Sequence, residues 1–332
     1  MTRKDLIEIY KNANYQSLRA SVPRPREWHL PIFIYQNFKD KKDYFNQHLK
    51  GNKIEISLDK EDFQILIPTL LHESLFSFYK GFYTYLSAKN LYEAGALHWI
   101  NITGYYAKLF LAQSINTICG KRKYVVKRDK YFFLNDVFRT LKPYKEITND
   151  SSYCMTLDFN ISTQEGRILF STDRFGSSHN QIWNAYAEID HTSLGLTKMT
   201  YDDFMDKNPM HLSNERNVEN YTFEGFMQVD FNLDLQNFSP YFDRALVKEE
   251  AELVYDDKLG IVLGIISEFH HLYKDFEIER LPIEPEKYKH MVQYMISNEV
   301  LREKLIDLVE RGFPKENEYI DEMHILYSDS EY

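Results

Sequence analysis

Two long apolar segments decide the fold of this chain: DKEDFQILIPTLLHESLFSFYKGFYTYLSA at residues 59–88 and GALHWINITGYYAKLFLAQSI at residues 95–115. The first carries apolar residues on nearly every face, which is typical of a buried central helix, and Pro68 either kinks it or marks a fresh first turn. The second belongs to a helix predicted from about Tyr92 to Ile118, and Gly120 suits its end. Together the two segments predict an antiparallel helical hairpin.

The second helix of this hairpin has an aromatic stripe and several small residues. Trp99, Thr103, Tyr106 and Phe110 recur at helical spacing and fall on one stripe. Small residues that would let another helix approach closely are Ala94, Gly95, Ala96, Ala107 and Ala112. The hairpin is therefore expected to be the centre of a mostly helical fold.

Short strands and further helices are predicted around the hairpin. Strand-like patterns occur at KIEISL (53–58), KRKYVV (121–126), YCMTLDFN (153–160) and GRILFST (166–172). Helical spacing occurs within residues 1–19, near 134–141, at 178–189, from about 213, at 246–273 and at 286–311. The sequence therefore predicts a mainly α fold with a small β insertion and helical N- and C-terminal extensions.

The order of these elements predicts three regions. Residues 1–58 are expected to form a mixed N-terminal cap, and residues 59–275 a helical domain with its β insertion at about 121–172. Residues 276–332 are expected to form a C-terminal helix followed by an acidic tail. No internal repeat or low-complexity linker separates these regions.

Composition narrows the class of protein. The 332 residues include 40 Lys and Arg against 50 Asp and Glu, a net charge of −10, which argues against a broad coat of nucleic acid but permits a local basic groove. The N-terminal MTRKDLIEIYKN lacks a signal-peptide pattern, and the apolar stretch from His98 to Cys119 is interrupted by polar residues, so no membrane span is predicted. Cys119 and Cys154 form no paired framework, which fits a cytoplasmic location and two core residues.

Most catalytic fingerprints are absent. The chain has no GxxxxGK[ST], GxGxxG or GxSxG sequence, and His72-Glu73 lacks the second histidine that a zinc-binding helix needs. His270 and His271 are adjacent on a predicted helix and point about 100° apart, so one is expected to be solvated and the other packed. No metal site and no cofactor are predicted.

The segment LSNERNVENYTFEGF, residues 212–226, is the candidate site. Ser213 is a suitable N-cap, which places Arg216 in the first turn and brings Asn220 and Tyr221 to its side of the helix. A guanidinium beside free backbone N–H groups favours an anion such as phosphate. The alternative is an ordinary salt bridge at Arg216 with a packed tyrosine.

The hairpin followed by the Arg216-Asn217 dipeptide resembles the HEPN-like helical superfamily. Its ribonucleases bring Arg-polar-x3-His motifs together from two protomers or two repeats. Arg216-Asn217 matches the first half of the motif, and Tyr221 stands where the histidine would fall. The resemblance implies a metal-independent endoribonuclease of a bacterial antiviral defence or toxin–antitoxin system, acting on RNA as a homodimer, with a possible partner protein encoded nearby.

The tyrosine changes the expected chemistry. Cleavage through the 2′-hydroxyl needs a base near neutral pH, and tyrosine with an ordinary pKa of about 10 is a poor one. Tyr221 could donate a hydrogen bond or a proton while Arg216 stabilises charge on the phosphorane. Arg174-Phe175-Gly176-Ser177-Ser178-His179 repeats the Arg-x4-His spacing, so His179 could supply the base and Arg174 could bind RNA; the alternative is a glycine turn at a helix start.

A basic strip near residue 121 is the candidate RNA-binding surface. It consists of Lys121, Arg122, Lys123, Lys127 and Arg128, interleaved with Tyr124. Asn220, outside this strip, is also predicted to bind RNA. The alternative is a solvated edge strand. Two other functions stay open: a non-catalytic HEPN-like module that binds RNA, a nucleotide or a partner protein, and a helical scaffold in which the motif is accidental.

Overall fold

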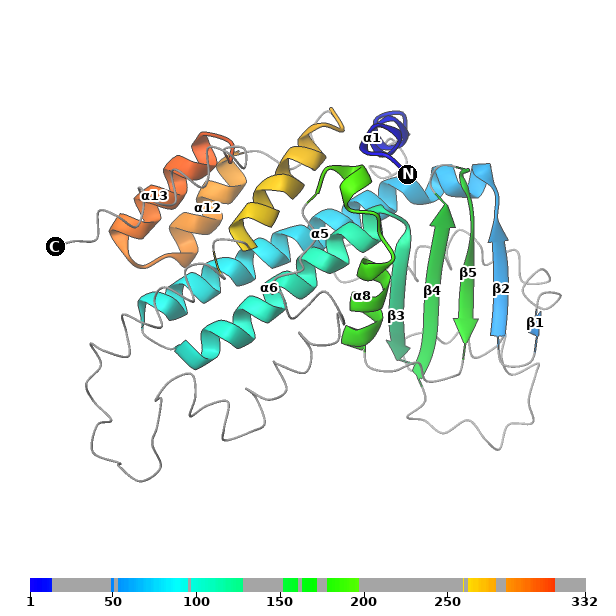
Figure 1. Ribbon diagram of the computed structural model, residues 1–332, viewed down its shortest axis with the longest axis horizontal. Helices are drawn as coiled ribbons and strands as arrows, with labels where there is room; N and C mark the ends of the chain where they lie inside the picture. The colour runs from blue at the N-terminus through cyan, green and yellow to red at the C-terminus, as the bar shows by residue number, and fades with distance from the viewer. Residues whose placement is uncertain are drawn as a thin grey trace, which may run out of the picture. The chain divides into compact units, whose positions relative to one another are not determined.

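The computed structural model describes residues 1–13, 49–50, 53–94, 97–127, 152–160, 163–171, 178–196, 259, 262–278 and 285–313 (Figure 1). These residues are mainly helical and include one small antiparallel sheet, so the predicted fold class is confirmed at this level. The chain divides into two compact units. The first contains residues 1–77 and 112–194, and the second contains residues 78–111 and 195–332.

The predicted hairpin is present as α5 (Lys60–Glu93) and α6 (Leu97–Ile118), each of which contributes residues to both units. Asp59 caps α5 by accepting hydrogen bonds from the amides of Glu61 and Asp62, both at 2.9 Å, and α5 continues through Pro68. In the first unit, the Ser74 hydroxyl donates to the Ser114 carbonyl at 2.7 Å, and the Ser114 hydroxyl donates to the Ser74 carbonyl at 2.9 Å. This reciprocal pair holds the helices in antiparallel register.

Gly81 allows the same two helices to meet closely in the second unit. A Cβ atom at this position would lie 2.9 Å from Cγ of Leu111 and 3.4 Å from the carbonyl oxygen of Ala107. The glycine is therefore required by packing against α6, and its neighbours on α6 are the small and apolar residues that the sequence pattern indicated. At the other end of α6, Gly120 has φ +74°, the left-handed conformation that ends a helix.

The first unit contains an antiparallel sheet in the order β1-β2-β5-β4-β3. Its strands are β1 (Leu49–Lys50), β2 (Lys53–Leu58), β3 (Lys121–Lys127), β4 (Ser152–Asn160) and β5 (Glu165–Ser171). The four predicted strands are all present, and the pairing of β2 with β5 joins a strand of the predicted N-terminal cap to the predicted β insertion. One face of the sheet is apolar and buried, and the ring of Phe159 lies 5.4 Å from that of Phe63 on α5.

Three short helices complete the described part of this unit. Helix α1 (Arg3–Lys11) begins with a capping box between Thr2 and Asp5 and ends at Lys11, well before the predicted residue 19. The Tyr10 hydroxyl of α1 donates to the Ile118 carbonyl at 2.8 Å. Helix α8 (Ser178–Ala187) packs against β3, and η4 (Thr192–Leu194) contacts α1.

The second unit packs helical residues 262–274 with α12 (Pro285–Met295) and α13 (Glu299–Glu310). The single helix predicted at 286–311 is wrong, because Asn298 caps a new helix by accepting the Leu301 amide at 3.1 Å. Aromatic rings fill the core: Tyr288 lies 5.3 Å from the ring of Phe82 and 5.3 Å from that of Phe313.

Several predicted elements lie outside the described residues. They are the helices near 134–141 and from about 213, and the first part of the helix at 246–273. Within the described ranges, no helix combines the length and the apolar character needed to cross a membrane.

Candidate functional site

The predicted site residues lie partly inside and partly outside the described part of the chain. Arg174, Arg216, Asn217, Asn220, Tyr221 and Arg128 lie outside the described residues. His179, Lys121, Arg122, Lys123 and Lys127 lie within them. The described part of the chain therefore contains one member of the predicted catalytic set, His179, and the roles of the others stay predictions.

His179 is the second residue of α8 and its side chain is half-buried. The helix that carries it is anchored to α6, because the buried Asn116 amide donates to the Ile182 carbonyl at 2.8 Å. Trp183, one turn further along α8, is 1% exposed and packs edge-on against Tyr186. His179 thus sits in the first turn of a firmly packed helix, where the free backbone N–H groups favour an anion.

The predicted basic strip is divided between the two faces of β3. Lys121 forms an ion pair with Asp158 on β4, and Lys123 is half-buried on the same side of the strand. Arg122 points to the opposite face, as the two-residue period of a strand requires, and is 7% exposed. It therefore does not belong to an exposed RNA-binding surface, which corrects the prediction at that position. Lys127 is the last residue of β3.

Arg122 belongs to a buried polar cluster that the sequence analysis missed. Its Nε lies 3.8 Å from a carboxylate oxygen of Glu73 on α5, and the side-chain amide of Gln113 on α6 faces its terminal nitrogens. His72 is adjacent in sequence, and burial lowers its pKa to about 4. The signal for the cluster was a Glu within a nearly continuous apolar helix, because such a residue rarely lies in a core without a partner. Its geometry is that of a structural ion pair joining α5, α6 and β3.

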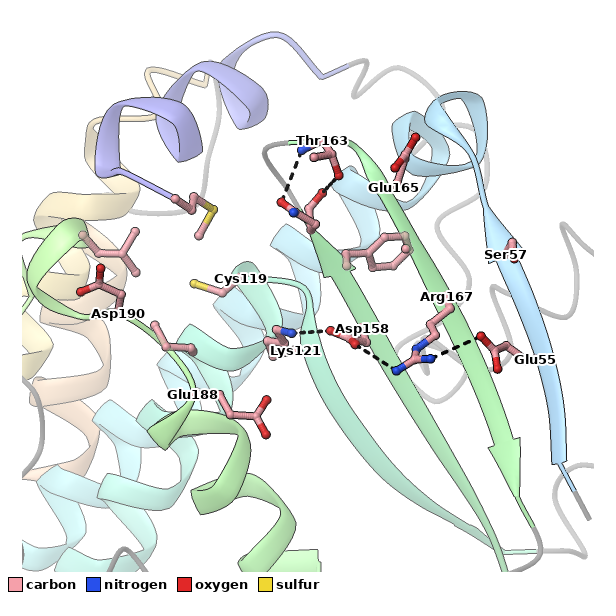
Figure 2. Close-up of a pocket in the computed structure, with 16 residues that line it drawn as sticks. Glu55, Ser57, Cys119, Lys121, Asp158, Thr163, Glu165, Arg167, Glu188 and Asp190 are labelled. Carbon is pink, nitrogen blue, oxygen red and sulfur yellow. Dashed lines mark hydrogen bonds and ion pairs between the residues drawn. The ribbon is translucent and has the colours of Figure 1, made fainter. Parts of the chain in front are cut away.

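The solvent-facing side of the sheet forms an open cleft of about 750 Å³ beside the segment after α8 (Figure 2). A row of alternating charges crosses the strands at this cleft. Lys121 on β3 pairs with Asp158 on β4, and Arg167 on β5 lies 3.7 Å from Asp158 and 3.4 Å from Glu55 on β2. Such cross-strand pairs stabilise the sheet, and the half-exposed pairs contribute little each.

The cleft is negatively charged. Among its described lining residues, the cations Lys121 and Arg167 face five carboxylates: Glu55, Asp158, Glu165, Glu188 and Asp190. The Ser193 hydroxyl donates to Asp190 at 2.5 Å and the Ser193 amide at 3.1 Å, and these hydrogen bonds lower the pKa of Asp190. The carboxylate therefore stays ionised at neutral pH. An excess of negative charge disfavours RNA phosphates in this cleft.

Cys119 lines the cleft without being a nucleophile. The side chain is 5% exposed, and burial raises the pKa of its thiol to about 12. A reactive cysteine needs the opposite, a thiol pKa lowered toward neutrality by positive surroundings. The prediction that Cys119 is a core residue is confirmed. The same prediction for Cys154, which lies on strand β4, stays a prediction.

The second unit contains a buried histidine in an aromatic environment. His270 is 4% exposed, and its Nδ1 lies 3.1 Å from the hydroxyl of Tyr288. Burial lowers the pKa of His270 to about 4, and the nearby positive charges of His271 and Lys274 act in the same direction. His271 is half-buried, and its Nε2 lies 2.6 Å from the Phe313 carbonyl oxygen. His270 is therefore the packed histidine of the prediction, but His271 is not the fully solvated one.

Among the described side chains, these two histidines belong to no metal-binding group. In the described ranges, no group of three or more His, Cys, Asp or Glu residues is arranged to hold a metal ion. Comparison with known proteins adds no relative: no protein-family model, curated protein or solved structure matches this chain.

Proposed function

We propose that this chain is a HEPN-like protein that cleaves RNA as a metal-independent endoribonuclease. The observation that carries the proposal is the combination of the α5–α6 antiparallel hairpin with the later sequence Arg216-Asn217-x3-Tyr221. In the proposal, Arg216, Asn217 and Tyr221 act at the scissile phosphate. The wider context of a bacterial defence or toxin system, a homodimer and a partner protein encoded nearby comes from the same resemblance.

The proposed reaction needs a base, an acid and a group that stabilises charge. A base removes the proton of the 2′-hydroxyl, whose oxygen attacks the adjacent phosphorus; the 5′-oxygen leaves with a proton, and a 2′,3′-cyclic phosphate remains. Histidine, with an ordinary pKa of about 6.5, suits the base. His179 is the candidate base on an anchored helix, Tyr221 is the candidate proton donor, and Arg216 stabilises the phosphorane.

The charges near β3 bear on where the proposed RNA would bind. Lys121 and Arg122 of the predicted strip already face Asp158 and Glu73, and the adjacent cleft is negative. Lys123 retains its proposed role in the strip. The RNA phosphates are therefore expected away from the sheet cleft.

A second candidate function is a non-catalytic module that binds RNA, a nucleotide or a partner protein. The observation that favours it is Tyr221 in the position of the motif histidine. Arg216 would then bind an anion and Tyr221 would stack on it, with no turnover.

One experiment separates these functions. Purified protein is incubated with total RNA in excess EDTA, and new RNA ends are mapped for wild type, Arg216→Ala and His179→Ala. Arg311→Ala is the matched control, because Arg311 is exposed at the end of α13, where it pairs with Asp307, and it belongs to no predicted site. Cleavage by wild type and Arg311→Ala alone, leaving 2′,3′-cyclic phosphates, supports the ribonuclease.

Other results reject it. Equal cleavage by Arg216→Ala removes the motif from the mechanism. Intact RNA with specific binding that Arg216→Ala abolishes supports the binding module instead. Intact RNA without binding rejects both functions for the isolated chain.

A further inference from the structure

One part of the α5–α6 hairpin, between Glu73 and Glu93 and along α6, has no acidic residue in an otherwise acidic chain. About one residue in seven is Asp or Glu overall, with 50 among 332 residues. Helix α6 has none in its 22 residues, and α5 has none between Glu73 and Glu93. The same stretches contain Lys80, which is exposed, and Lys89 and Lys108, which are buried. Lys80 is therefore an exposed cation in a stretch that has no carboxylate of its own, which suits an anionic ligand.

Two rows of the hairpin, both in the second unit, form an aromatic and positively charged surface. Lys80, Tyr83 and Ser87 follow one face of α5, and Trp99, Thr103, Tyr106 and Phe110 follow one face of α6 at helical spacing. The rows meet, because the Lys80 ammonium lies 4.1 Å from the centre of the Phe110 ring and Gly81 packs on Leu111. We call these seven residues the aromatic face.

The aromatic face presents rings to solvent. Trp99 is 56% exposed and Tyr83 is 45% exposed, whereas most large apolar side chains described in this unit are buried. Lys80 is exposed, and the rings of Tyr106 and Phe110, whose centres are 6.3 Å apart, are partly exposed. Exposed aromatic residues gathered at one place mark a binding surface.

The composition of this face favours nucleic acid over protein. It has four aromatic rings, a lysine, two hydroxyl side chains and no aliphatic residue. Lysine is depleted from the centres of protein interfaces, whereas a lysine among aromatic rings is typical of surfaces that bind single strands. The rings stack on bases and the ammonium attracts the phosphates. Stacking requires unpaired bases, because a duplex keeps its base faces covered.

We propose that the aromatic face binds single-stranded RNA, with Tyr83 and Trp99 stacking on bases and Lys80 contacting the backbone. The proposal deepens the proposed function, on which its choice of RNA rests. It places the recognition of the substrate on the hairpin, separate from the motif residues that perform the cleavage.

Fluorescence anisotropy tests the proposal with a labelled single-stranded oligouridylate of about twelve nucleotides and with a duplex RNA of the same length. The full wild-type chain is used, and both RNAs carry 2′-O-methyl groups, so that no 2′-hydroxyl is available for attack and the RNA remains intact. Trp99→Ala and Tyr83→Ala are each expected to weaken binding of the single strand by about tenfold, since one stacked base contributes a factor of that order. Tyr294→Ala is the matched control, because Tyr294 is 81% exposed on α12, outside the aromatic face.

The salt dependence tests the lysine. Lys80→Ala is expected to reduce the slope of log affinity against log salt by about 0.7, the value for one phosphate contact with a single strand. Lys287→Ala, an exposed lysine on α12, is expected to leave the slope unchanged. Circular dichroism checks that each variant keeps the wild-type helix content.

The proposal is overturned if Trp99→Ala and Tyr83→Ala bind the single strand like wild type, or if duplex RNA binds equally tightly. It is also overturned if these variants keep RNA affinity but dissociate a dimer in sedimentation velocity, which would assign the face to a second copy of the chain. Its failure is distinguishable from that of the proposed function: RNA cleavage with unchanged KM in Trp99→Ala rejects the aromatic face alone. Binding through the face without cleavage by wild type rejects the ribonuclease alone.

Discussion

His270 predicts how the stability of this chain depends on pH. The side chain is 4% exposed in the second unit, with its Nδ1 near the Tyr288 hydroxyl and its ring 5.1 Å from that of Phe313. An imidazolium at this place would lose its hydration, and Lys274 and His271 add positive charge nearby. Burial therefore lowers the pKa of His270 to about 4, from an ordinary 6.5.

The sign and size of the effect follow from this difference. Between pH 4 and 6.5 the unfolded chain binds a proton at His270 and the folded chain does not, so the contribution of His270 to stability rises with pH in this window and is constant above it. Across the whole window, the contribution of His270 to the free energy of unfolding changes by about 3 kcal/mol. His72 has its pKa lowered in the same direction and adds to the loss in wild type.

Urea unfolding at pH 7.5 and pH 4 measures the effect in wild type, His270→Gln and His290→Gln. The glutamine removes the titration, so the stability lost between the two pH values is expected to be smaller in His270→Gln than in wild type by about 3 kcal/mol. Loss of the Tyr288 hydrogen bond costs about 1 kcal/mol at both pH values and cancels in the comparison. His290 is exposed on α12 and serves as the control. If His270→Gln and wild type lose the same stability on acidification, the burial argument is refuted.

Two further predictions concern packing and reactivity. Gly166→Ala is expected to destabilise the fold by about 2 kcal/mol, because its Cβ would lie 2.6 Å from the Asp158 carbonyl oxygen, whereas Gly104→Ala, with nothing within 4 Å, is expected to stabilise α6 by up to about 1 kcal/mol. Thermal unfolding of both variants checks this pair, and equal effects would contradict it. Cys119 is expected to react with iodoacetamide at pH 8 far more slowly in the native chain than in the urea-unfolded chain, because burial raises its thiol pKa to about 12. Mass spectrometry after timed quenching measures the two rates at Cys119, and equal rates would contradict the prediction.

Local sequence patterns were sufficient for the hairpin and the strands. The α5 segment is apolar on nearly every face and Asp59 is a good N-cap, so both its identity and its start can be predicted from neighbouring residues. The break between α12 and α13 was missed although Asn298 signals it, because the apolar spacing continues across the break. Asparagine within a helical pattern is a weaker signal than Gly or Pro.

Long-range pairing explains what the sequence did not reveal about the sheet and its charges. The strand β2 pairs with β5 more than a hundred residues later, and no local pattern specifies that partner. The partner of Arg122, Glu73, likewise lies on another element. The inward direction of Arg122 was predictable, because alternate residues of a strand face opposite sides and KRKYVV reads as a strand. Arg122 therefore lies on the opposite face of β3 from Lys121 and Lys123.

The distribution of charge reconciles a net charge of −10 with the proposed RNA ligand. Carboxylates gather at the sheet cleft of the first unit, whereas the hairpin residues of the second unit, from Lys80 to Asn90 and along α6, include none. A polyanion that meets such a chain gains little from general electrostatic attraction, so its affinity must come from short-range contacts. Base stacking on Tyr83 and Trp99 is such a contact, and it requires no overall positive charge. Selection of unpaired RNA would then follow from the same cause, because a duplex offers phosphates but no base faces to these rings.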